Sequence, residues 1–228
     1  MTIVWDKISE LAYQIEEKIK LSGTAITSLS HEYNWYNSIY TSDRYRRAHI
    51  EVVDFRKSHN IYILHTTIFP HSNDPSPIWG FDAVCGPNKI TGAFHDFSNA
   101  GEPHHPMSQW FKTTTAGLTW NKPRQLPEWA KAIFSENMVA AGNVNDPTEL
   151  DSLCNIALTS LDYYLANVGN SQESGADYHM AQNRYCKYQK QNPHVIRSMV
   201  AMGIPEYTMK QFVDTILFPE INVDYTSK

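Results

Sequence analysis

The sequence contains few cysteines, no long apolar stretch and no secretion signal. Its 228 residues include three cysteines, Cys85, Cys154 and Cys186, and no CxxC pair. This odd number fits a reducing compartment, and we expect neither a disulfide framework nor a cysteine-based zinc site. No stretch approaches the roughly 18 apolar residues of a membrane span. The charged N-terminal segment also lacks the apolar core of a signal peptide. These absences predict a soluble, cytoplasmic protein with no membrane partner.

The chain also lacks an excess of basic residues. Its 24 acidic residues outnumber its 19 Lys and Arg residues, which gives a formal net charge of −5. A general nucleic-acid-binding protein is usually basic, so we expect no nucleic-acid partner. Basic residues do cluster at positions 44–47, 112–124 and 184–190. Such clusters could dock an acidic protein if they meet in space.

Aromatic residues and histidines are plentiful. Aromatics make up 12% of the chain, which also has 10 His. They suit a large, flat apolar ligand, and they suit an ordinary core equally well. The hydrophobic and charged fractions, 42% and 19%, are typical of globular proteins. The length predicts a single domain that spans residues 1–228.

Hydrophobic periodicity predicts helices at both ends of the chain and strands between them. Apolar spacing of three and four residues predicts helices over residues 5–20, 149–168, 176–191, 194–202 and 205–217. β-Branched and aromatic runs predict strands over 46–55, 60–69, 78–85, 89–97 and 136–141. The segment 98–127 is rich in Pro, Gly and His and is expected to be a long loop. This order predicts an α+β fold, with helices packed on an antiparallel sheet, rather than a Rossmann fold.

Three neighbouring predicted strands each carry an ionisable group within an apolar run. His49 and Glu51 are two residues apart and therefore point to the same side of a strand. His65 and Asp82 occupy the next two strands. A carboxyl group in an apolar strand costs free energy unless it is paired, protonated or used. The alternative is a set of separate polar groups on a solvated sheet face.

Other catalytic chemistries have weaker support in the sequence. It contains no GxSxG, GxGxxG or GxxxxGK[ST] motif. His49, Glu51 and His65 could form a site of two histidines and one carboxylate, with His104 and His105 as further candidates. The chain has no HxxxH or HExxH spacing, however. We therefore expect no bound metal, and a metal-dependent enzyme remains an alternative.

Several segments together resemble the ferredoxin-dependent bilin reductases. They are RRAHIEVV, ILHTTIFPH, PIWGFDAVCG and ITGAFHDFS. LPEWAKAIFSE and NRYCKYQKQN are similar to the phycocyanobilin-forming branch. The resemblance covers most of residues 44–218, and the series HxE, LHxxxFP and PxxGxD is specific in combination. It implies a three-layer α/β/α sandwich, with a central antiparallel sheet flanked by helices. An open-chain tetrapyrrole would lie between the sheet and the C-terminal helices.

The resemblance also implies a chemistry. Such enzymes carry no flavin, nicotinamide or metal, and reduced ferredoxin, an iron–sulfur protein, delivers electrons singly, so that bilin radicals are intermediates. The protein then holds its substrate and supplies protons. Asp82 matches the aspartate that faces the pyrrole nitrogens, and His65 matches its histidine partner, able to relay protons. His49 and Glu51 match the family's HxE, with Glu51 near a vinyl group that it could protonate.

The chain departs from the family pattern at two positions. Asn192 stands where bilin reductases commonly have a second aspartate, and an amide cannot donate a proton as an acid. Gly142 stands where relatives tend to have an arginine that could hold a propionate. Another basic residue, Arg197 or Lys112, would then have to replace it.

These observations lead to one expected function and two alternatives. We expect a monomeric, ferredoxin-dependent oxidoreductase that acts on CH–CH groups and reduces biliverdin IXα by four electrons to phycoerythrobilin, through 15,16-dihydrobiliverdin. Asn192 and the compact length resemble the marine-phage offshoot of the phycocyanobilin branch, which makes this product. The alternatives are reduction to phycocyanobilin and a non-catalytic tetrapyrrole-binding protein on the same fold.

Overall fold

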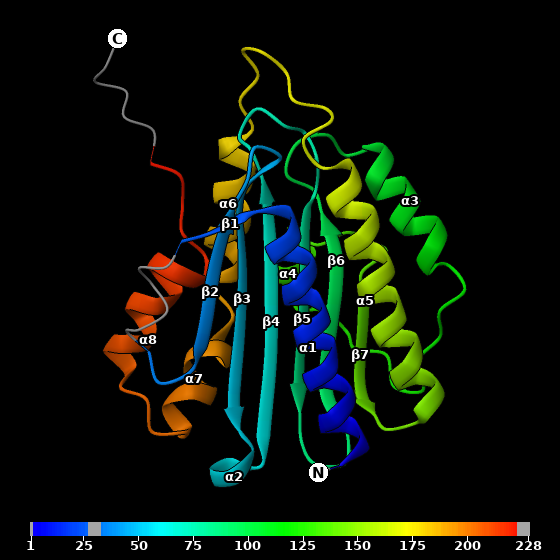
Figure 1. The fold of residues 1–228 in the computed structure, drawn as a ribbon, viewed down its shortest axis with the longest axis vertical. Coiled ribbons are helices and arrows are strands. Elements are labelled where there is room, and N and C mark those ends of the chain that lie inside the picture. Colours follow the sequence, from blue (N-terminus) through cyan, green and yellow to red (C-terminus); the bar gives the residue numbers. More distant parts are fainter. Residues whose placement is uncertain (1, 27–32, 223–228) are drawn as a thin grey trace.

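The protein is built on one antiparallel sheet whose strands follow chain order. The computed structural model describes residues 2–26 and 33–222. Its seven strands lie in the order β1 to β7, and each pairs with the next one along the chain. Helices cover both faces of the sheet (Figure 1). The α+β sandwich predicted from the sequence is therefore confirmed.

The strands and helices have the following bounds. The strands are β1 Thr24–Ala25, β2 Tyr36–Thr41, β3 Tyr45–Phe55, β4 Ile61–Pro70, β5 Ile78–Cys85, β6 Ile90–Ser98 and β7 Val139–Val144. The helices are α1 Ile3–Ser22, α2 Arg56–His59, α3 Pro106–Thr115, α4 Glu128–Lys131, α5 Pro147–Asn167, α6 His179–Gln189, α7 Pro193–Ala201, α8 Glu206–Phe212 and the π-helical turn η2 Val213–Leu217. No helix within residues 2–26 and 33–222 combines the length and apolarity needed to traverse a bilayer.

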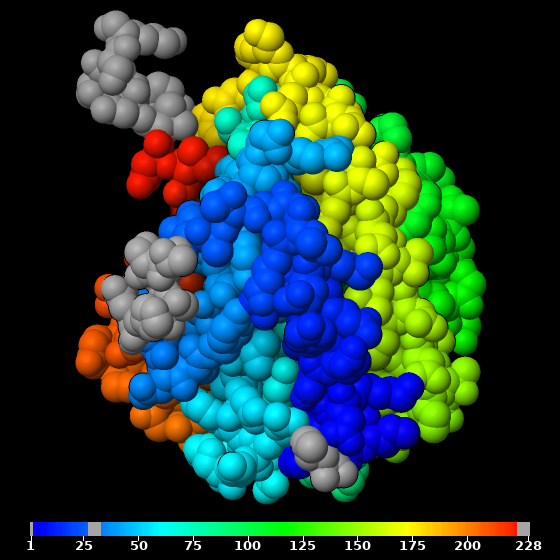
Figure 2. Space-filling view, viewed as in Figure 1, coloured from blue at the N-terminus to red at the C-terminus, as the bar shows by residue number. Residues whose placement is uncertain are grey.

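Helices α1, α3 and α5 form the layer on one face of the sheet. Figure 2 shows α1 and α5 side by side across this face, where Lys7 and Lys18 of α1 pair with acidic side chains of α5. The N-terminus of α5 is fixed by Asp146, whose carboxylate accepts hydrogen bonds from the backbone N–H groups of Thr148 and Glu149. Apolar residues of both helices pack against the sheet and form the larger core.

A buried polar network joins α5 to the middle of the sheet. His95 on β6 has one ring nitrogen 2.7 Å from the carbonyl oxygen of Gly80 and the other 2.7 Å from Oγ of Ser160 on α5. The indole Nε1 of Trp79 donates to the same Ser160 oxygen at 3.1 Å. Each of these buried polar groups is satisfied, so the network holds α5 in one position on the sheet.

Helices α4, α6, α7 and α8, with η2, form the layer on the opposite face. Side chains alternate along each strand, so Ile50 and Leu64 face the α1–α5 layer while Glu51 and His65 face the C-terminal helices. Phe69, Tyr185 and Phe212 belong to the smaller core on this second face. The fold therefore turns the ionisable groups of β3–β5 toward the α6–η2 layer.

The sequence predictions differ from the structure at several elements. The predicted loop 98–127 contains α3. Pro106 begins this helix, at a position where a backbone N–H would have no partner within the helix, and the ring of His105 caps its N-terminus. Strands β1 and β2 and the short helices α2 and α4 have no counterpart among the predicted elements. The expected last helix, 205–217, is α8 followed by the wider turn η2.

Candidate active site

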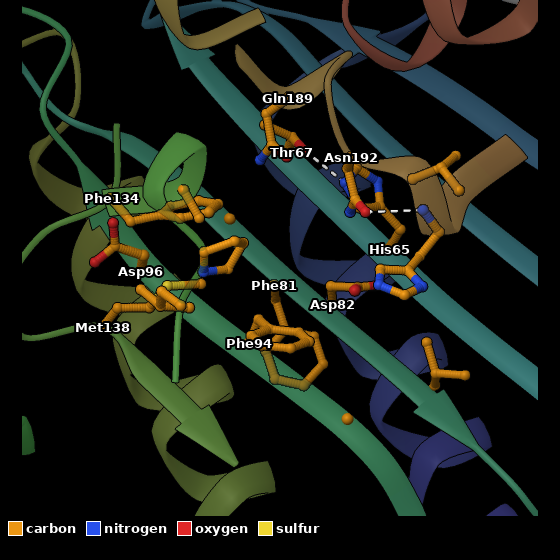
Figure 3. Close-up of a pocket in the computed structure, with 18 of the residues that line it drawn as sticks. His65, Thr67, Phe81, Asp82, Phe94, Asp96, Phe134, Met138, Gln189 and Asn192 are labelled. Atoms are coloured by element: carbon orange, nitrogen blue, oxygen red, sulfur yellow. Dashed lines mark hydrogen bonds between the residues drawn. The ribbon is translucent and has the colours of Figure 1, made fainter. Parts of the chain in front are cut away.

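A cavity of about 550 Å³ lies between the sheet and the C-terminal helices. Strands β3–β6 form its floor, the segment 124–138 forms one wall, and α6, α7 and the chain after η2 cover it. In Figure 3, Asn192 and Gln189 extend from the helical side toward the strands that carry His65 and Asp82. Pockets of this size bury drug-sized ligands, and they combine an apolar lining with a few polar groups that fix orientation.

Three ionisable side chains form a row across the cavity floor. Glu51 on β3 is the register partner of His65 on β4, and His65 is the partner of Asp82 on β5. All three line the cavity. Directly opposite residues of an antiparallel pair have Cβ atoms about 4.5–5.5 Å apart, so the three groups are neighbours. In Figure 3 the His65 ring extends from its strand toward Thr67, to which a dashed line joins it.

Burial shifts the pKa values of all three groups. It raises the pKa of Glu51 to about 8, a shift that the nearby Asp82 increases and a hydrogen bond from Trp35 opposes. Burial also raises the pKa of Asp82 to about 7 and lowers the pKa of His65 to about 4. Near neutral pH, Glu51 therefore keeps its proton, Asp82 exchanges its proton readily, and His65 is neutral. This row can donate protons to a ligand on the cavity floor.

Trp35 contacts the row, and the sequence analysis did not indicate it. Its indole Nε1 donates to Oε1 of Glu51 at 2.6 Å. The indole is held by Tyr33 and Phe212, each with a ring centroid 5.1 Å away. Because Oε1 accepts this bond, the proton of Glu51 is directed to Oε2. Trp35 lies just before β2, and no sequence motif links it to Glu51. The contact between the two residues is therefore seen only in the structure.

His49 lies behind the row rather than in it. It is fully buried and is not among the residues that line the cavity. Its Nε2 lies 3.1 Å from Oδ1 of Asn37, whose Nδ2 donates to the carbonyl oxygen of Trp35 at 3.2 Å. Burial, with Arg47 and His65 nearby, lowers the pKa of His49 well below its usual value, so the ring is neutral. His49 therefore supports Trp35, and through it Glu51, instead of lining the site.

His65 has one ring nitrogen without a protein partner. Its Nε2 lies 3.3 Å from Oγ1 of Thr67. Its Nδ1 is buried and makes no hydrogen bond within the described part of the chain. Buried polar atoms are nearly always satisfied, so an unpaired nitrogen facing a cavity is suited to a ligand atom.

Of the other residues predicted to bind the substrate, one lines the cavity and two do not. Asn192 lines the cavity, and its Oδ1 caps α7 by accepting a bond from the N–H of His194 at 3.0 Å. Arg197 is an exposed residue of α7 and Lys112 an exposed residue of α3, and neither lines the cavity. The basic residue that does line it is Arg124, on the wall.

Two further sets of predicted residues take other positions. The structure gives no geometric support to the metal alternative, because no group of three or more potential ligands converges as a metal ion would require within residues 2–26 and 33–222. Of the basic cluster at 44–47, Arg44 donates to the carbonyl oxygens of Ala166 and Val168 at the end of α5. The Arg44 guanidinium therefore caps the C-terminal end of α5.

Known proteins are similar to this chain in sequence and in fold. A family model described as ferredoxin-dependent bilin reductase matches residues 7–219. The phycocyanobilin:ferredoxin oxidoreductases of Gloeobacter violaceus and Trichodesmium erythraeum are each 28% identical to this chain, over 188 and 196 residues. These alignments cover 80% and 82% of this chain and 72% and 76% of the two relatives.

Solved structures give the same result. The structure of PcyX is 26% identical in sequence and superposes with a TM-score of 0.70, covering 94% of this chain and 99% of that one. Phytochromobilin synthase from tomato, solved in complex with biliverdin, has 14% identity and a TM-score of 0.70 over 90% of this chain and 80% of that chain, and it shares the fold. The chain therefore belongs to the ferredoxin-dependent bilin reductases, a family of oxidoreductases. Within that family its relatives are those of the phycocyanobilin branch.

Proposed function

We propose that this protein reduces biliverdin IXα to phycoerythrobilin, with 15,16-dihydrobiliverdin as the intermediate. Each of the two steps adds two electrons and two protons to the bilin, so the whole reaction takes up four of each. Reduced ferredoxin supplies the electrons one at a time, and bilin radicals alternate with closed-shell species. The observation that carries this proposal is the row of Glu51, His65 and Asp82 on the floor of a cavity large enough for the substrate.

The proposed mechanism assigns one task to each member of the row. Each electron makes the bilin more basic, and an acid held close to it can then transfer a proton. With a pKa of about 7, Asp82 suits this donation near neutral pH and can be reprotonated between steps. The neutral His65 holds a ring carbonyl through its unpaired Nδ1 and returns protons to Asp82. Glu51, protonated at Oε2, is the second donor.

The product assignment rests on the helical side of the cavity. Asn192 lines this side, and its amide can donate a hydrogen bond but no acidic proton. A further cavity carboxyl, Asp96, accepts bonds from the side chains of Ser98 and Ser135 and from the backbone of Ser135, which leaves it committed to the protein. Glu51 and Asp82 are then the carboxyl donors available to the substrate. This arrangement resembles the phycoerythrobilin-forming offshoot.

A second product has support of its own. The curated relatives at 28% identity are named phycocyanobilin:ferredoxin oxidoreductases, which favours phycocyanobilin as the alternative product. A bilin carrier without catalysis would need the cavity and its aromatic residues, but it would not need the carboxyl of Asp82. We propose no tightly bound cofactor, because ferredoxin supplies the electrons and the chain's carboxyl groups supply the protons.

One anaerobic experiment separates these possibilities. Biliverdin IXα is incubated with the protein, ferredoxin and a ferredoxin-reducing system, and spectra are recorded before the products are separated by chromatography. Transient 15,16-dihydrobiliverdin followed by phycoerythrobilin is the expected result. Phycocyanobilin would establish the alternative product. A shifted biliverdin band that persists under reduction would identify a carrier and overturn the proposal.

A further inference from the structure

A threonine hydroxyl contacts the histidine of the cavity floor. Thr67 and His65 are two residues apart on β4, so their side chains project from the same face of the strand, and both line the cavity. Oγ1 of Thr67 lies 3.3 Å from Nε2 of His65 (Figure 3). Thr67 is fully buried, and its hydroxyl makes no other hydrogen bond to residues 2–26 or 33–222. The hydroxyl therefore acts on His65 alone.

Two neighbouring rings hold the imidazole of His65 in place. Phe218, in the chain after η2, meets it edge-on with a centroid distance of 5.7 Å and an interplanar angle of 89°. The ring of His49 lies 6.1 Å away on the neighbouring strand. These contacts restrict rotation of the His65 ring. Nε2 therefore stays next to Thr67, and Nδ1 is the nitrogen left for a ligand.

The position of the imidazole proton follows from counting donors and acceptors. Burial lowers the pKa of His65 to about 4, so the neutral ring carries one N–H, on either Nε2 or Nδ1. With the proton on Nε2, Thr67 would accept this bond, and both its own hydroxyl proton and the bare Nδ1 would be unpaired. With the proton on Nδ1, the hydroxyl donates to Nε2, and the Nδ1–H is the one group left unpaired. Since each unpaired buried polar group costs free energy, the second arrangement is favoured.

We propose that Thr67 is a positioning residue that fixes the tautomer of His65, so that Nδ1 carries the proton and donates a hydrogen bond to a carbonyl oxygen of the ligand. This inference rests on the proposed function for the identity of that oxygen, which would be the lactam oxygen of an end ring of the bilin. The opposite tautomer would present a bare nitrogen, which would accept a hydrogen bond from a ring N–H instead. Thr67 therefore selects which polar group of the end ring lies against His65.

The tautomer can be measured by NMR in the free protein at neutral pH. The chemical shifts of the ring nitrogens distinguish a protonated nitrogen from a bare one, and comparison with His65→Gln assigns the signals of His65. Wild type should show a protonated Nδ1 and a bare, hydrogen-bonded Nε2. Thr67→Val replaces the hydroxyl by a methyl group of similar size and should move the signals toward the Nε2–H form, which is the commoner form of neutral histidine in water. Thr67→Ser keeps the hydroxyl and should retain the wild-type pattern.

Thr66→Val is the matched control. Thr66 is the next residue on β4, pairs with Ile50 and faces the α1–α5 layer, and its buried hydroxyl has no partner in the described part of the chain. This variant should leave the signals of His65 unchanged. A protonated Nε2 in wild type would overturn the inference, as would the same tautomer in wild type and Thr67→Val.

Absorbance titration with biliverdin IXα extends the test to the ligand. Thr67→Val should raise the dissociation constant about fivefold, the effect of one neutral hydrogen bond, whereas Thr67→Ser and Thr66→Val should stay within about twofold of wild type. Equal affinity in Thr67→Val and wild type would show that the ligand does not depend on the tautomer, and it would overturn the assigned bond to a carbonyl oxygen. A wild type that binds no biliverdin would instead refute the proposed function, while the NMR result would still decide the role of Thr67.

Discussion

The indole Nε1 of Trp35 donates a hydrogen bond to Oε1 of Glu51 at 2.6 Å, which leaves Oε2 as the oxygen that carries the proton when Glu51 is protonated. The donor favours the ionised form of Glu51, whereas burial favours the protonated form and prevails. The result is an acid that still holds its proton at neutral pH but holds it in one defined place.

Replacing Trp35 by Phe should change both the orientation and the pKa of Glu51. Loss of the donor raises the pKa of Glu51 further above about 8, by about 0.5–1 unit. A step that needs protonated Glu51 slows as pH rises through this pKa, so the alkaline fall of the single-turnover rate should move to higher pH. The maximal rate should also drop, because the proton is no longer fixed on Oε2. An unmoved pH profile would show that Trp35 has only a packing role.

Replacing Asp82 by Asn should stop proton transfer while biliverdin remains bound. The amide keeps the size and hydrogen-bonding capacity of the side chain but removes the acid, and loss of a general acid typically costs about 10²–10⁴-fold in rate. His65→Gln is the matched variant, since it keeps a hydrogen bond to the ligand without a proton relay and should slow turnover less. Single-turnover spectra with ferredoxin measure both rates. Normal turnover in Asp82→Asn would remove it from the mechanism.

The same substitution should alter the pH dependence of stability. The pKa of Asp82 is raised by folding from 3.8 to about 7, so between these values the folded state binds more protons than the unfolded state. The contribution of Asp82 to the free energy of unfolding therefore falls as pH rises through this window. Asp82→Asn should gain stability relative to wild type between about pH 4 and pH 7, as measured by urea denaturation. A difference that does not vary with pH would show that this carboxyl is not protonated on folding.

Product identity should depend on Glu51 and Asn192. Glu51→Gln removes one of the two donors and should stall the reaction at a two-electron intermediate without abolishing binding. Asn192→Asp keeps the cap of α7, since Asp and Asn are equivalent at this position, and adds an acid on the helical side. It should speed the second reduction or change the isomer ratio, as read by chromatography. Identical products and rates in both variants and wild type would leave substrate orientation as the source of specificity.

The rate of electron delivery should depend on salt concentration, but Arg44 should not contribute to this dependence. At subsaturating ferredoxin, turnover should fall as ionic strength rises, because association of an acidic donor is steered by charge. Arg44 closes the end of α5, so Arg44→Gln should lower the melting temperature by about 2–4 °C. It should leave the salt dependence of turnover unchanged. A flatter salt profile in this variant would restore Arg44 to the docking surface.

The sequence was sufficient for the main elements and for the row on the cavity floor. Alternation along β3, β4 and β5 indicated one face, and the family resemblance named Glu51, His65 and Asp82. It could not predict Trp35, because this residue acts through a contact with a different segment of the chain. The helix at 106–115 was hidden because Pro106 and His105, residues typical of loops, begin and cap it.

The strictly sequential order of the strands has a consequence for how the protein is made. Strands β3 to β5 can pair with one another during synthesis before α6, α7 and η2 have left the ribosome. At that stage Glu51 and Asp82 face water and are ionised. When the C-terminal helices close over them, their pKa values rise to about 8 and about 7, and the chain takes up protons from solvent. The final stage of folding thus adds protons to the two carboxyl groups that we propose as donors.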